Sequence, residues 1–72
     1  MEKLDLHGMP HYLVENDLVR TLNRLWNTNT ELEVVTGNSE RMKDIVMKVL
    51  REHGLEFQDG DMHNFGYIKT VV

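Results

Sequence analysis

The sequence predicts an α/β two-layer sandwich with the element order βαβαββ, in which two helices cover one face of a four-stranded mixed sheet. Segments that alternate apolar and polar residues, typical of strands, are interspersed with two segments whose apolar residues recur every three or four positions, typical of helices. Turn-forming residues separate these segments. With 72 residues and neither a repeat nor a low-complexity linker, we expect a single domain spanning residues 1–72.

The first strand is expected over residues 3–7, where apolar and polar side chains alternate up to a glycine. Because side chains alternate across a strand, Leu4 and Leu6 share one face and Asp5 and His7 share the other. Two helices cannot cover both faces of four strands well. We therefore expect the leucines to face the helices, and Asp5 and His7 to lie on the more open face.

The first helix is expected to begin at Pro10, since proline suits the first helical turn, and to end near residues 27–29. Its apolar residues follow spacings of four, four and three along one face. This predicted stripe consists of Val14, Leu18, Leu22 and Leu25.

The second strand, residues 32–35, stops at Thr36 and Gly37, and Asn38 or Ser39 is a suitable cap for the helix that follows. The apolar residues of this second helix match a one-sided pattern, and Gly54 ends it. The predicted stripe consists of Met42, Ile45, Val46, Val49 and Leu50.

The last two strands are expected over residues 55–58 and 65–72, on either side of a turn-rich stretch. Two βαβ units imply that the first three strands run parallel, with the fourth antiparallel beside the third. Carboxyl ends of parallel strands meet at one edge of a sheet. Residues 7–8, 36–39 and 58–64 should therefore share one rim.

Composition excludes several classes of function. The chain has no cysteine, which excludes disulfides, thiolate metal sites and thiol nucleophiles. No apolar run approaches the roughly 20 residues that span a bilayer, so we expect a soluble, cytoplasmic protein without a membrane partner. Twelve acidic and eight basic residues give a net charge of −4. Because this balance disfavours coating nucleic acid through charge alone, any phosphate contact must be local.

Asp5 and His7 are candidate catalytic residues. Two positions apart on a strand, they point to the same side, close enough for the carboxylate to support the imidazole. Histidine is the natural proton carrier near neutral pH, so the pair suits general acid–base chemistry. The alternative is an ordinary polar strand face, because this spacing arises easily by chance.

The turn before the second helix is a candidate anion site, because backbone N–H groups are free and the helix dipole is positive at a helix start. Its hydroxyl and amide side chains would bond a phosphate or sugar, and two basic residues add positive charge. The alternative is a plain strand-to-helix turn with a good cap. The candidate residues are Thr36, Gly37, Asn38, Ser39, Arg41 and Lys43.

His63 is the third catalytic candidate, because it opens the last strand on the same expected rim. Together with Asp61 it repeats the spacing of Asp5 and His7, which also allows a site with two carboxylates and two imidazoles for a metal. This spacing carries little of the specificity of known ligand signatures. We therefore expect no metal or other cofactor and keep the metal site as the alternative.

Taken in order, the motifs resemble those of the small MutS-related (Smr) domain family. The chain opens with Leu4-Asp5-Leu6-His7-Gly8, continues with an amphipathic helix, a Val-Val-Thr-Gly strand end and a second helix, and closes with an Asn-x-Gly-x-Ile strand. The resemblance covers nearly the whole chain. It implies a fold similar to the C-terminal domain of translation initiation factor 3, and an association with nucleic-acid nicking and endonucleolytic RNA cleavage.

The resemblance carries the catalytic D-x-H element of the family onto Asp5 and His7, and its substrate-binding T-G-x-G loop onto residues 36–39. Ser39 stands where the second glycine is expected, which adds a Cβ where backbone would approach a phosphate. Asn64 and Gly66 match the glycine-rich start of the final strand imperfectly.

We thus expect a small endonuclease, a hydrolase that cleaves RNA without a metal. In this hypothesis the ribose 2′-hydroxyl attacks the adjacent phosphate, His7 moves a proton, Asp5 orients it and the Thr36–Ser39 loop holds the phosphate. His63 is the candidate second proton carrier. The alternatives are a non-catalytic module that binds nucleic acid or the ribosome, and a small protein-interaction domain. A targeting protein as partner would choose the substrate.

Overall fold

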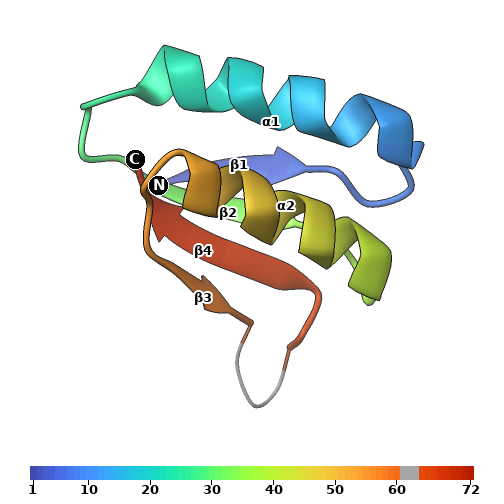
Figure 1. Ribbon diagram of the computed structural model, residues 1–72. Helices are drawn as coiled ribbons and strands as arrows, with labels where there is room; N and C mark the ends of the chain where they lie inside the picture. The colour runs from blue at the N-terminus through green and yellow to red at the C-terminus, as the bar shows by residue number, and fades with distance from the viewer. Residues whose placement is uncertain (61–63) are drawn as a thin grey trace.

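The computed structural model describes residues 1–60 and 64–72, and its element order is the predicted βαβαββ. Figure 1 shows two helices lying across one sheet. In chain order the elements are β1 (Glu2–Asp5), α1 (His11–Leu25), β2 (Glu31–Val35), α2 (Glu40–Glu52), β3 (Phe57–Asp59) and β4 (Tyr67–Val71). Each lies within a few residues of its expected place.

The four strands form one sheet in the order β1-β2-β4-β3. β1 pairs parallel with β2, and β4 pairs antiparallel with both β2 and β3. The first three strands therefore point the same way, and the fourth returns beside the third, as expected. However, β4 lies between β2 and β3. Three of its five residues, Tyr67, Ile68 and Thr70, are buried, which suits a central strand.

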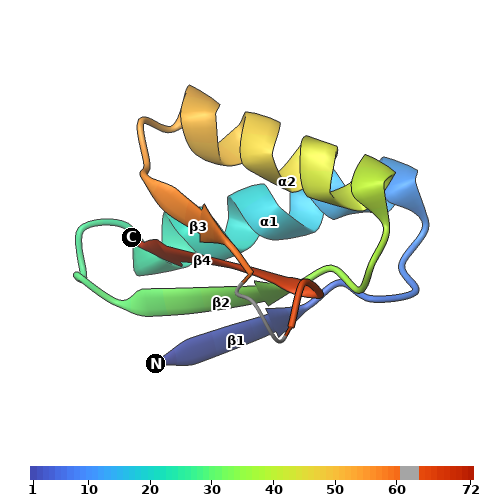
Figure 2. The same cartoon turned by 90° about the horizontal axis from the view of Figure 1, so that it is seen from below.

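Both helices cover the same face of the sheet, which gives the predicted two layers (Figure 2). Both apolar stripes point into the core, although Ile45 at the edge of its stripe is only partly buried. Leu6 is fully buried and Leu4 partly buried, whereas Asp5 and His7 are exposed on the other face. The predicted orientation of the first strand is confirmed. In the part of the chain that the structure describes, no helix is both long and apolar enough to cross a membrane.

Local chemistry explains the ends of α2. Ser39 is the N-cap, and its hydroxyl oxygen accepts a hydrogen bond of 3.2 Å from the Met42 N–H. Gly54 follows the helix with a positive φ of 71°, its N–H donates to the Arg51 carbonyl, and the Leu55 N–H donates to the Leu50 carbonyl. These two bonds form a Schellman motif, which satisfies carbonyls that the helix end leaves unpaired.

Candidate active site

One end of the molecule gathers the predicted site residues. β1 and β2 end there, β4 begins there, and both helices begin there (Figures 1 and 2). The Leu6 N–H donates to the Val35 carbonyl, and the Thr36 N–H donates to the Gly66 carbonyl, so three strand ends are tied together. We call this surface the strand-end rim and define it by residues 5–8, 36–41 and 64–66.

His7 lies against Gly37 within the strand-end rim. Gly37 has a φ of +65°, and a Cβ built on it would lie 3.5 Å from Cδ2 of the His7 ring. The exposed imidazole therefore packs over the backbone of the Thr-Gly turn. Two motifs that are 29 residues apart in the chain thus share one surface. Gly37 suits this place because glycine tolerates a left-handed conformation, whereas a Cβ there would only come into ordinary contact with the ring.

Asp5 contacts the backbone of His7. Its Oδ1 atom accepts a hydrogen bond of 3.0 Å from the His7 N–H. Such a bond between an aspartate and the N–H two residues on fixes the chain direction just after β1. The carboxylate thus bonds to the backbone of His7, on the same exposed face as the imidazole, and the orienting role of Asp5 toward the ring stays a prediction.

The expectation that the backbone N–H groups of the turn are free is wrong for Thr36 and Gly37. Both donate to the carbonyl of Gly66, at 2.9 and 3.0 Å, and the Thr36 hydroxyl donates to the Gly37 carbonyl at 2.8 Å. Thr36 is also buried. The acceptor comes from the start of β4, so reading the turn by itself could not reveal it. The sequence singles out Gly66 through its Asn-x-Gly motif, but did not predict that the Gly66 carbonyl would bind the Thr-Gly turn.

The N-terminus of α2 retains the features of an anion site. Its first N–H groups lack intrahelical acceptors, and only that of Met42 is satisfied by the Ser39 hydroxyl. Asn38 and Arg41 are exposed beside it, and Arg41 makes no ion pair with any other described residue. Glu40 in the same turn is also exposed and brings a negative charge that opposes an anion.

Lys43 points away from the solvent. Its side chain is 4% exposed, and Nζ lies 2.8 Å from Oδ1 of Asp59 at the end of β3. Because this charge already has a close partner, Lys43 links α2 to β3 inside the molecule. The structure therefore brings the predicted anion-site residues together at the turn, with Lys43 engaged below the surface.

His63 and Asp61 lie outside the described residues, so the predicted second proton carrier and the four-residue metal site have no geometry here. Within residues 1–60 and 64–72, no group of three or more His, Asp or Glu side chains is arranged to hold a metal ion.

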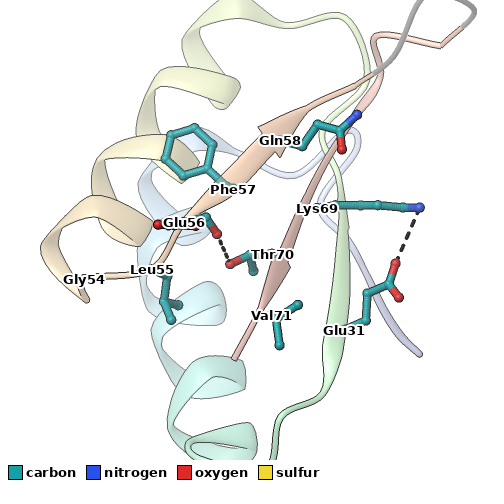
Figure 3. Close-up of a pocket in the computed structure, with 9 residues that line it drawn as sticks. All are labelled: Glu31, Gly54, Leu55, Glu56, Phe57, Gln58, Lys69, Thr70 and Val71. Carbon is teal, nitrogen blue, oxygen red and sulfur yellow. Dashed lines mark hydrogen bonds and ion pairs between the residues drawn. The ribbon is translucent and has the colours of Figure 1, made fainter.

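A groove of about 640 Å³ lies at the opposite end of the sheet, where β2 begins, β4 ends and the chain enters β3 (Figure 3). Its walls contain an ion pair of 3.5 Å between Lys69 and Glu31, and the Thr70 hydroxyl donates to the Glu56 carbonyl at 2.6 Å. No histidine lines it. The chemistry predicted from the sequence therefore lies on an exposed surface away from this groove.

Comparison with known proteins supports the architecture. No protein-family profile and no curated protein sequence matches the chain significantly. Among solved structures, the chain is similar to the human small-MutS related domain, with a TM-score of 0.76 and 28% sequence identity. The match covers 97% of this chain and 99% of the human one. The chain therefore has the fold of a small MutS-related domain over nearly its whole length, which confirms the resemblance carried by its motifs.

Proposed function

We propose that this chain is an endonuclease that cleaves RNA by acid–base catalysis at the strand-end rim. The observation that carries the proposal is the position of the His7 imidazole, exposed to solvent and packed 3.5 Å from the Cβ position of Gly37. A proton carrier thus lies beside a turn that leads into a helix N-terminus, where a phosphate is electrostatically favoured. The resemblance to small MutS-related domains points to the same two motifs.

The reaction moves one proton to the enzyme and one from it. The ribose 2′-hydroxyl attacks the adjacent phosphorus and loses its proton to a general base, while the 5′-oxygen of the next nucleotide leaves and takes a proton from a general acid. The products are a 2′,3′-cyclic phosphate and a free 5′-hydroxyl. His7 fills one of these two roles. His63, from its place in the sequence before Asn64, is our candidate for the other.

Backbone dipoles near the strand-end rim favour a phosphate there, although the exposed carboxylates of Asp5 and Glu40 oppose it and the net charge of the chain is −4. Both α1 and α2 begin there, so two positive dipole ends face the same surface. The first turn of α1 contains no acidic residue. The Arg41 guanidinium and the Asn38 amide add exposed hydrogen-bond donors.

A substrate series tests the chemistry. We expect the protein to cut an RNA strand in the presence of EDTA, and to leave uncut the same strand with a 2′-deoxyribose at the cleavage position, because the internal nucleophile is then missing. The 3′ ends of the products, analysed by mass spectrometry, should carry the cyclic phosphate. Efficient cutting of an all-DNA strand, or chelator inhibition that zinc or manganese reverses, would contradict the mechanism.

A second candidate is a non-catalytic module of the same fold that binds nucleic acid or the ribosome. It is favoured by the turn itself, where the N–H groups of Thr36 and Gly37 donate to the Gly66 carbonyl and the Met42 N–H donates to the Ser39 hydroxyl oxygen. Fewer donors then remain for a transition-state oxyanion. Salt-sensitive RNA binding without any cleavage product would favour this candidate over the enzyme.

A further inference from the structure

Phe65 is an apolar side chain that the fold leaves in solvent. It is 60% exposed and takes no part in the hydrophobic core. Isolated exposed apolar residues are common, so exposure alone says little. Phe65 is unusual in its position, one residue before the glycine that ties β4 to the Thr-Gly turn.

The backbone on both sides of Phe65 is held in place. The Gly66 N–H donates to Asn64 Oδ1 at 2.9 Å, which forms a tight turn around Phe65. The Gly66 carbonyl accepts from both Thr36 and Gly37. On the other side, a Cβ on Gly60 would lie 2.7 Å from the Asn64 carbonyl oxygen and 3.0 Å from the Phe65 Cα, so backbone packs closely there. The ring is therefore presented from a defined backbone position.

The backbone next to Phe65 packs closely against the Thr-Gly turn, which in turn lies beside His7. A Cβ on Gly66 would lie 3.6 Å from the Gly37 Cα, and the Gly37 Cβ position lies 3.5 Å from the His7 ring. Gly66 and Gly37 thus lie between the backbone of Phe65 and the exposed imidazole of His7. Phe65, the exposed imidazole and the start of α2 therefore come from neighbouring backbone segments, a combination that fits a nucleotide, with its flat base beside its phosphate.

We infer that Phe65 stacks on an unpaired base next to the phosphate held at the strand-end rim, so that the substrate is single-stranded RNA. This inference rests on the proposed function and specifies its substrate class. In a duplex each base is already stacked between its neighbours, whereas an unpaired base offers a free face to an aromatic side chain. Stacking does not require positive charge, so it offers an acidic protein a route to nucleic acid that charge alone does not.

The test uses short 2′-O-methyl RNA strands, which resist cleavage, each with one 2-aminopurine whose fluorescence falls on stacking. We expect the protein to bind the single strand more tightly than the matching duplex and to quench the probe at one position. Phe65→Leu should weaken single-strand binding about tenfold and abolish the quenching, whereas Phe65→Tyr should retain both.

Trp26→Leu is the matched control, because Trp26 is 46% exposed at the far end of α1, where its ring meets that of His53. This variant should bind the strands like the parent protein. Circular dichroism and melting curves of all three variants should match the parent, since none of these rings is buried in the core. Unchanged binding and quenching by Phe65→Leu, or equal affinity of the parent for duplex and single strand, would overturn the inference.

Cleavage assays separate this inference from the proposed function. If Phe65→Leu binds weakly while His7→Ala still cleaves normally, the stacking role stands and the catalytic assignment falls. If His7→Ala loses cleavage while Phe65→Leu binds and cleaves like the parent, the stacking role falls and the enzyme remains. An absence of any RNA binding by the parent protein contradicts both.

Discussion

Among single residues, Gly37 has the largest influence on the geometry of the candidate site. Its positive φ favours glycine, and its missing Cβ leaves open the space beside the His7 ring. Sequence reasoning identified the Thr-Gly pair as important but assigned its importance to free N–H groups. The structure gives a different reason, because those groups bond to Gly66 while the positive φ of Gly37 forms the turn that brings its backbone beside the His7 ring.

A pair of alanine substitutions separates these two properties of glycine. Gly54 has a similar φ of +71°, and a Cβ there would meet no atom within 4 Å. We therefore expect Gly37→Ala and Gly54→Ala to lose similar stability, about 1 kcal/mol each, from the strained backbone. Only Gly37→Ala should slow RNA cleavage, by about tenfold, because its methyl group fills space beside the imidazole where a phosphate would approach.

Urea unfolding and single-turnover cleavage would measure the two effects. Equal cleavage rates in the two alanine variants would mean that the space above Gly37 is not used by the substrate. The turn would then be only a connection between β2 and α2.

At the scale of elements, both helices follow from local sequence. The apolar spacing predicted which side of α1 and α2 faces the core, and Ser39 and Gly54 predicted where α2 begins and ends. Lys43 was less predictable. A lysine close to a helix start reads as a surface charge, but its long side chain extends inward to Asp59 on β3. That partner lies on another element, so no local pattern indicated it.

The ion pair between Lys43 and Asp59 should respond unequally to removal of its two members. Asp59→Ala leaves a buried ammonium without its counter-charge and should cost about 2 kcal/mol or more. Lys43→Met replaces the ammonium with an apolar chain of similar length and leaves a half-exposed carboxylate in water, so it should change stability by about 1 kcal/mol or less.

Urea midpoints at neutral pH would test this order, and a larger loss in Lys43→Met than in Asp59→Ala would contradict it. The same Lys43→Met protein tests the earlier expectation that Lys43 contacts phosphate. We expect folded Lys43→Met to retain RNA binding, because the ammonium lies below the surface. Loss of binding in the folded variant would show that Lys43 reaches the substrate.

At the scale of the whole molecule, the order of elements and the two layers could be predicted because each strand and helix carries its own periodic signal. The sheet order could not. Placing β4 between β2 and β3 depends on pairs such as Val34 with Ile68, which join distant segments. The shared rim was still predictable, since the carboxyl ends of strands that point the same way lie at one edge, whichever strand separates them.

The central claim is that His7 moves a proton during RNA cleavage, and the most direct measurement compares His7→Ala with His11→Ala. His11 is the matched control because it lies at the start of α1, at the same end of the molecule. Since His7 is exposed, its removal should change the free energy of unfolding by no more than about 0.5 kcal/mol. Single-turnover cleavage of RNA should fall by about a hundredfold or more in His7→Ala and stay unchanged in His11→Ala. Full cleavage by a folded His7→Ala protein would contradict the claim.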